Sequence, residues 1–205
     1  MGIYTTKSKW QKALQPIIDF SVRRRIHPDV FTYGALLLSL IAALAFYSAN
    51  TNKNWLWVAL PLILIRLLLN LMDGQVARSL NLADDWGEVK NEFGDRIADA
   101  VIFMAIGLSG YAKIQLAFTA LTLVLLVSYL GILGKASGGP RVYRGWFGKG
   151  DRMVSLAIFT LYPAISGNLA SYNYYLIFAA ILAFITIIQR LRVIYGNHHR
   201  SQSAR

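Results

Sequence analysis

The residues that decide the fold of this chain are N-L-M-D-G-Q-V-A-R, at 70–78, and G-E-V-K-N-E-F-G-D-R-I-A-D, at 87–99, separated by eight residues. They place carboxylates and carboxamides at the ends of two long apolar runs. Ionisable groups at membrane depth are costly and mark functional sites. We therefore expect chemistry where these two runs meet.

Helical periodicity brings the polar side chains of each run onto one face. At 3.6 residues per turn, Arg66, Asn70 and Asp73 share one face of the first helix. On the next helix the side chains that recur every four residues are Asn91, Asp95 and Asp99. Two facing helices then converge oxygen ligands on one point. Hard divalent cations such as Mg²⁺ or Mn²⁺ take such ligands, and a pair of cations can clamp a pyrophosphate.

Composition indicates a polytopic membrane protein. Of the 205 residues 56% are hydrophobic and only 15% are charged, and the apolar residues fall into long runs. No internal repeat is evident, and we expect a single domain over residues 1–205. The sequence has no cysteine, which excludes a disulfide framework and a thiolate metal site.

The apolar runs predict an all-α membrane fold with six transmembrane helices. Each run approaches the ~20 residues that cross the hydrocarbon core. A basic and apolar segment at about 3–27 predicts an amphipathic interfacial helix before the first span. Residues 195–205 are expected to form a polar tail. The predicted spans are about 30–49, 55–72, 94–111, 114–134, 153–169 and 173–194.

Basic residues predict the orientation of the spans. Three connections contain only Lys53 and Lys113, whereas the termini and the other two loops contain nearly all the rest of the 21 basic residues. Both termini and the polar site are therefore expected on the cytoplasmic side, and we expect the bacterial cytoplasmic membrane. This asymmetry and attraction to anionic lipid explain the net charge of +11 without nucleic acid binding.

The 70–99 segment resembles the CDP-alcohol phosphotransferase family of membrane enzymes that make phospholipids. The family pattern is D-x2-D-G-x2-A-R-x8-G-x3-D-x3-D, and its members have six spans behind an amphipathic helix. The positions that match it, at the family spacing, are Asp73, Gly74, Ala77, Arg78, Gly87 and Asp95. Asp99 also resembles the D-R-I-x-D of phosphatidylinositol-phosphate synthase relatives.

Two positions depart from the pattern, because Asn70 and Asn91 stand where the first and third aspartates belong. The resemblance implies that four aspartates hold two divalent metals and that the last one, here Asp95, is the general base. An amide offers a neutral oxygen and cannot bridge two metals as a carboxylate does, so metal affinity should fall. The predicted metal ligands are Asp73, Asp95, Asn70 and Asn91, with Asp99 as a further candidate.

The resemblance implies transfer of a phosphatidyl group from CDP-diacylglycerol to an alcohol, with release of CMP. Asp95 would take the proton from the acceptor hydroxyl. The family also implies a homodimer. The residues implied to contact the CDP-lipid donor are Gly74, Ala77, Arg78 and Gly87.

The second polar concentration is the 135–152 loop, where Gly138, Gly139 and Pro140 break the helix. Basic residues here are candidates for binding an acceptor phosphate or a lipid headgroup, although the positive-inside rule alone also explains them. These residues are Arg141, Arg144, Lys149 and Arg152.

Arg66 lies inside the predicted membrane span, where its charge needs a partner. We expect Asp95 or Asp99 to be that partner, unless the Arg66 side chain snorkels to the interface.

Three interpretations of the whole chain stay open. The first is the lipid synthase, and the second is a degenerate homologue that acts as a non-enzymatic membrane partner. The third, a transporter, is disfavoured because no pair of discontinuous helices is evident.

Overall fold

The computed structural model describes the backbone of residues 7–203 and the side chains of residues 14–198. All regular structure within this part of the chain is helical. The elements are α1 (Lys7–Arg23), α2 (Pro28–Ser48), α3 (Trp55–Ser79), α4 (Asp85–Leu108), α5 (Ile114–Ala136), α6 (Lys149–Ser166), a 3-10 turn (Leu169–Ser171) and α7 (Tyr172–Ser203). The predicted start of the interfacial helix at residues 3–6 and the last two residues of the predicted tail lie outside the described residues.

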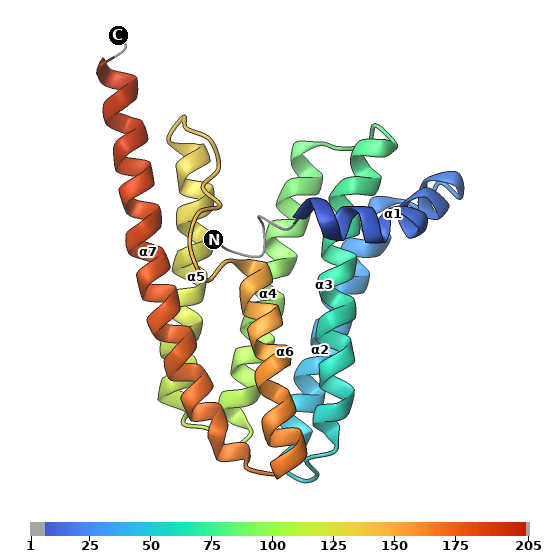
Figure 1. The fold of residues 1–205 in the computed structure, drawn as a ribbon, viewed down its shortest axis with the longest axis vertical. Coiled ribbons are helices and arrows are strands. Elements are labelled where there is room, and N and C mark those ends of the chain that lie inside the picture. Colours follow the sequence, from blue (N-terminus) through green and yellow to red (C-terminus); the bar gives the residue numbers. More distant parts are fainter. Residues whose placement is uncertain (1–6, 204–205) are drawn as a thin grey trace.

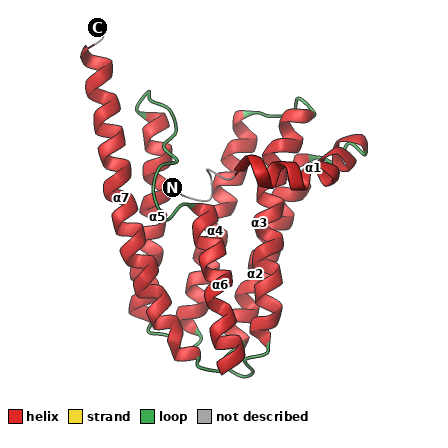
Figure 2. Ribbon diagram, in the orientation of Figure 1, coloured by secondary structure: helices red, strands yellow, loops and turns green. Residues whose placement is uncertain are grey.

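The six helices α2–α7 run alongside one another, while α1 lies across one end of the bundle (Figure 1). In sequence order, α2 packs against α3 and α4, α3 against α6, α4 against α5, and α5 against α7. The helices converge at the end opposite α1 and spread at the end that α1 crosses, where the longest loop joins α5 to α6 (Figure 2). The spread end is therefore the one with room for a ligand.

Four segments are long and apolar enough to cross a membrane among the described residues: α2, α3, α5 and residues 169–198. Helices α4 and α6 do not meet this criterion, since charged residues occupy their first turns. The all-helical membrane fold is confirmed, and the count of six spans stays a prediction. Helix α1 buries Leu14 and Ile18, which form a small core with Met72 and Val76 of α3.

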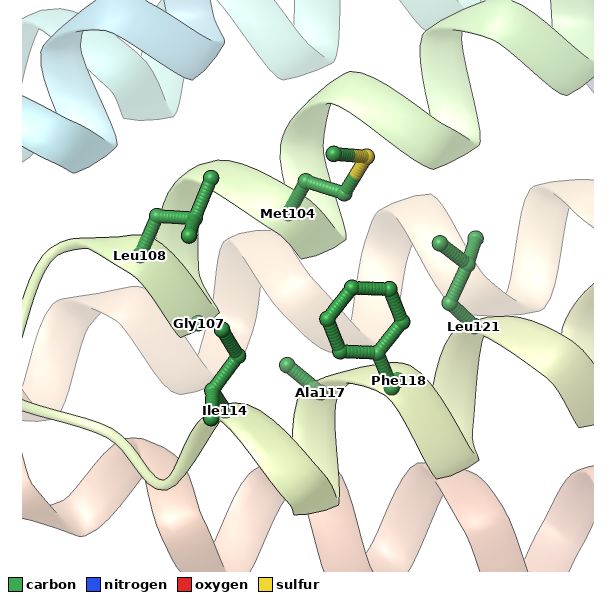
Figure 3. A pocket seen from close by; sticks show the side chains of 7 residues that line it. All are labelled: Met104, Gly107, Leu108, Ile114, Ala117, Phe118 and Leu121. Atoms are coloured by element: carbon green, nitrogen blue, oxygen red, sulfur yellow. The ribbon is translucent and has the colours of Figure 1, made fainter.

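The converging end is held by close helix packing. Phe46 of α2 and Phe159 of α6 surround the buried ring of Tyr172. A Cβ on Gly107 would lie 2.6 Å from the Cβ of Ala117, so glycine permits the close approach of α4 and α5. Figure 3 shows the apolar side chains that meet around Gly107; the space between them is only about 10 Å³ and has no polar lining atoms. It is a packing gap between helices rather than a site.

Several helices extend beyond the predicted spans: α4 begins at Asp85 and α6 at Lys149, ahead of the predicted starts at 94 and 153, and α3 and α7 continue past their predicted ends. Helix α3 continues past residue 72 to Ser79 and ends before Asn81, whose backbone is left-handed at φ 56°. Asp73, Gly74 and Ala77 therefore lie on the same continuous helix as Arg66. Helix α7 continues through residues 195–203, so the described part of the predicted polar tail is helical.

Candidate functional site

The motif residues are positioned by the turn between α3 and α4. Asp84 caps α4, since its Oδ1 accepts a hydrogen bond from the Gly87 N–H at 2.7 Å. A Cβ on Gly87 would approach that Oδ1 to 2.9 Å, which explains a glycine here by local geometry alone. A Cβ on Gly74 would lie 3.3 Å from Nη1 of Arg78, whose guanidinium folds back over this glycine.

The two polar helix faces meet. Asn91 donates from Nδ2 to Oδ2 of Asp73 at 2.6 Å, which joins α4 to α3. Asp73 and Asp95 are each only 4% exposed. The Lys149 ammonium contacts Oδ2 of Asp95 and lies 3.5 Å from Oδ1 of Asn91. The structure thus brings the α3 and α4 motif residues together and adds a lysine from α6.

A buried ionic cluster lies deeper in the bundle. Arg152 donates from Nη2 to Oδ2 of Asp99 at 2.6 Å, and Nη2 of Arg66 lies 3.6 Å from Oδ1 of the same carboxylate. Arg66 is also 3.9 Å from Asp95 and is 2% exposed, which confirms the expected pairing and excludes snorkelling. Arg96 lies 3.9 Å from Asp99. Asp99 is therefore surrounded by three guanidinium groups, a setting typical of a structural ion pair.

A large open cleft of about 900 Å³ lies at the spread end of the bundle. Its walls come from the first turn of α2, the last turns of α3, the first turns of α4 and the loop that precedes α6. The expected donor residues all line it, and so do two of the expected metal ligands. These lining residues are Gly74, Ala77, Arg78, Gly87, Asp73 and Asn91.

A second cavity, of about 160 Å³, adjoins the first, and Asn91, Arg141 and Tyr143 line both. It lies between α3, α4, α5, the 137–148 loop, α6 and α7 and is rich in cations. Its basic lining residues are Arg96, Arg141, Lys149, Arg152 and Arg190. Sequence reasoning missed Arg96 and Arg190, although the arginines within the last apolar run, Arg190 and Arg192, were an available signal.

The loop residues expected to bind phosphate have different environments. Arg141 is half-buried; it pairs with Glu92 and lies 3.2 Å from Glu88. Arg144 is exposed and does not line the second cavity. At the cleft rim, the hydrogen bond from Lys135 holds the pKa of Glu88 below its usual value. These acids tie the 137–148 loop to α4 at the point where the two cavities meet.

The donor set fits one oxygen-liganded cation better than two. The larger cleft offers the Asp73 carboxylate and the Asn91 amide, and the smaller cavity adds the Asn70 amide. Asp95 lines neither of them and borders a gap of about 10 Å³ together with Asn70 and Asn91. Nδ2 of Asn70 is buried and has no hydrogen-bond partner; as a donor it fits an oxygen of a ligand, while a cation would take the amide oxygen of the same side chain. Within the described residues, no cluster of three or more acidic or histidine side chains is arranged to hold a metal.

Comparison with known proteins identifies this arrangement. The family model of CDP-alcohol phosphatidyltransferases matches residues 25–189. The chain belongs to the CDP-alcohol phosphatidyltransferase family. The expected family is thereby confirmed, and the protein is an enzyme of the CDP-alcohol phosphatidyltransferase class, a membrane transferase of phospholipid biosynthesis.

Relatives within the CDP-alcohol phosphatidyltransferase family include bacterial and archaeal proteins. The inner membrane protein YnbA of Escherichia coli is 31% identical over 94% of this chain and 96% of its own length. The archaetidylinositol phosphate synthase of Aeropyrum pernix is 30% identical over 98% of this chain and its whole length. Both alignments are nearly full-length, so the similarity covers the whole bundle and not the motif alone.

Solved structures of the family share the fold. The phosphatidylinositol phosphate synthase of Mycobacterium tuberculosis with CDP-DAG bound superposes with a TM-score of 0.66 at 21% identity, over 88% of this chain and 92% of that chain. Its complex with manganese and citrate gives a TM-score of 0.68, over 88% of both chains. At this identity the likeness establishes the architecture of the bundle.

Proposed function

We propose that this enzyme transfers a phosphatidyl group from CDP-diacylglycerol to the hydroxyl of a small phosphorylated alcohol and releases CMP. The observation that carries the proposal is the pair of adjoining cavities, one lined by the donor motif and the other by five basic side chains. A CDP-lipid and an anionic acceptor would then meet beside Asn91 and Arg141, which line both. The CDP-DAG complex of the mycobacterial relative supports the donor.

The donor would lie in the larger cleft. Gly74 and Ala77 lack bulk on the cleft side of α3, so a nucleotide can approach the backbone there. The exposed guanidinium of Arg78 is available to the pyrophosphate. The adjoining first turn of α4 contributes Gly87.

The acceptor would lie in the smaller cavity. Cationic side chains at this density attract a phosphate, and guanidinium groups bind it in a bidentate manner. Arg141 sits on the side shared with the donor cleft, and Arg190 is held in place by hydrogen bonds to the carbonyls of Arg144 at 3.0 Å and Val127 at 2.6 Å. A phosphorylated acceptor therefore fits this cavity better than glycerol or serine.

In the reaction, the acceptor oxygen forms a bond to the β-phosphorus as the bond from that phosphorus to the CMP oxygen breaks. The carboxylate of Asp95, buried beside Asn91 and Lys149, takes the hydroxyl proton. Asp73, Asp95, Asn70 and Asn91 would hold Mg²⁺ or Mn²⁺, which when bound neutralises charge on the pyrophosphate. The manganese complex of the mycobacterial relative supports such a cation.

We further propose that all of α2–α7 cross the membrane with the site and both termini on the cytoplasmic face. The support is that the six helices lie side by side along one common axis (Figure 1) and that basic residues concentrate at the spread end. In this arrangement α1 lies in the interface. The homodimer stays a prediction from the family.

The test is CMP release from CDP-diacylglycerol by the purified protein with Mg²⁺ or Mn²⁺. The acceptor panel contains glycerol 3-phosphate, inositol phosphate, glycerol and serine. We expect release that depends on a divalent cation and on a phosphorylated acceptor. Asp95→Asn should lower the rate by about 10²–10⁴-fold, as expected for loss of a general base, while expression stays unchanged.

Two outcomes would contradict the proposal. Folded wild-type protein that releases no CMP with any acceptor or cation would favour the degenerate homologue that acts as a membrane partner. A wild-type rate in the Asp95→Asn variant would remove this carboxylate from the reaction.

A further inference from the structure

We propose that the Lys149 ammonium supplies the positive charge that a second divalent ion would otherwise supply to the reaction centre, so that the enzyme works with one divalent ion. The inference rests on the proposed function and concerns how that site neutralises the substrate pyrophosphate. It assigns Lys149 to the donor phosphates at the boundary of the two cavities, which leaves the other four basic side chains of the smaller cavity to the acceptor.

The position of Lys149 is fixed by the fold. It is the first residue of α6, and the Gly148 N–H just before it donates to Oδ2 of Asp151 at 3.0 Å, which closes the first turn. One turn further, Arg152 anchors the same helix end to Asp99 on α4 at 2.6 Å. The Lys149 side chain is 16% exposed. Its ammonium is therefore held against α4 rather than free in solvent.

The contacts of this ammonium are those of a cation bound by the motif. It touches Oδ2 of Asp95, a carboxylate that is 4% exposed, and lies 3.5 Å from the amide oxygen of Asn91. Asn91 in turn donates to Asp73. A single positive group thus lies among the same oxygens that would otherwise complete a second divalent site.

The local charge favours one divalent ion. The buried or half-buried groups around the motif comprise four carboxylates and five cations, a formal charge of 5 − 4 = +1; these groups are Asp73, Glu92, Asp95, Asp99, Arg66, Arg96, Arg141, Lys149 and Arg152. One divalent ion and a doubly charged pyrophosphate diester cancel and keep the sum at +1. A second divalent ion would raise it to +3 in a poorly solvated site, where the Asn70 and Asn91 amides add no negative charge.

The chemistry also suits an ammonium. Lysine and divalent ions both stabilise the negative charge that develops on transferring phosphoryl groups. Lys149 lines the smaller cavity beside Asn91, which borders the larger one. Its ammonium is therefore placed to contact a pyrophosphate at the boundary between donor and acceptor.

The experiment counts bound Mn²⁺ on metal-free protein in lipid nanodiscs, with and without CDP-diacylglycerol, from the EPR signal of free Mn²⁺. Nanodiscs of the same lipid without protein supply the background. The variants are Lys149→Met and the double variant Asn91→Asp with Lys149→Met. Lys113→Met, at an exposed position at the opposite end of the bundle, is the matched control.

We expect one Mn²⁺ per chain for the wild type and for Lys113→Met, and two for the double variant. Lys149→Met should bind one Mn²⁺ about tenfold more tightly, because an ammonium no longer repels the ion. It should also lose about 10²–10³-fold in CMP release, as for removal of one charge-stabilising donor. A merely structural lysine would also tighten metal binding when removed, but it would leave CMP release at saturating Mn²⁺ unchanged, so the two readouts are taken together.

Two Mn²⁺ in the wild type, or one in a folded double variant, would overturn the inference and leave the proposed reaction intact. Unchanged Mn²⁺ affinity in Lys149→Met would overturn it as well. If the wild type binds no Mn²⁺ in nanodiscs with or without CDP-diacylglycerol, the metal-dependent reaction itself is overturned together with this inference.

Discussion

Asp99→Asn tests whether the carboxylate at the end of the motif serves stability or metal binding. The carboxylate is 4% exposed and lies between Arg66, 2% exposed, and Arg152, 3% exposed. The asparagine keeps the shape and removes the charge, so buried Arg152 loses its counter-ion and buried Arg66 keeps only Asp95, at 3.9 Å. Breaking a buried ion pair in this way costs about 3–5 kcal/mol.

This cost predicts a large change in melting temperature. For a chain of this size each kcal/mol corresponds to about 2–4 °C, so Asp99→Asn should melt about 6–20 °C below the wild type in detergent. The measurement is a thermal melt followed by intrinsic tryptophan fluorescence, with Mn²⁺ affinity measured on the same preparation. Affinity should fall far less than in Asp95→Asn measured alongside, because Asp99 acts on the ion only through its charge and the three guanidinium groups already occupy its surroundings.

The matched control is Glu88→Gln, which removes the partly exposed ion pairs with Lys135 and Arg141. Glu88 is 38% exposed and pairs with Lys135, 52% exposed, so its loss should cost under about 1 kcal/mol and at most about 4 °C. A melting temperature for Asp99→Asn within the range of this control, combined with Mn²⁺ binding weakened as much as in Asp95→Asn, would refute the ion-pair role and restore Asp99 as a metal ligand.

Three further predictions concern the loop, the acceptor and the cation. Gly145→Ala should lower the free energy of unfolding by about 1–3 kcal/mol, because Gly145 has φ 135° and a Cβ would collide with Thr186. The measurement is a thermal melt, and the control is Gly196→Ala, which has open space around it. Equal melting temperatures for the two variants would contradict the strain. Arg141→Gln should raise KM for the phosphorylated acceptor about 10–150-fold, which corresponds to the loss of a hydrogen bond to a charged group. Arg144→Gln, at an exposed position, should leave KM unchanged. Equal KM values for the two variants would exclude Arg141 from acceptor binding. EDTA should stop CMP release and added Mn²⁺ should restore it, so a rate that survives chelation would show that no divalent cation is needed.

The bundle and the convergence of α3 and α4 could be predicted from the sequence because both depend on local periodicity. Apolar runs define the helices, and the four-residue spacing of Asn91 and Asp95 fixes the face that they share. The end of α3 was harder. Hydropathy marks where an apolar run stops near residue 72, whereas the backbone hydrogen bonds continue until the left-handed turn at Asn81.

The contacts that complete the site could not be predicted because they join distant parts of the chain. Lys149 meets Asp95 only after α6 packs between α3 and α7. The same holds for Arg190, whose Nη1 reaches the carbonyl of Val127 on α5. Local periodicity has no information on which helix lies opposite which, so the basic loop residues had equal claims until packing separated them.

The buried guanidinium of Arg66 has a consequence for how the protein is made. A charged side chain at the centre of a span costs about 2.5–3.5 kcal/mol in insertion by the translocon. The carboxylates that compensate it, Asp95 and Asp99, lie on the next helix, about 30 residues later in synthesis. Helix α3 therefore reaches its final stability in the bilayer only when α4 arrives, and the two helices, each packed against α2, mature together.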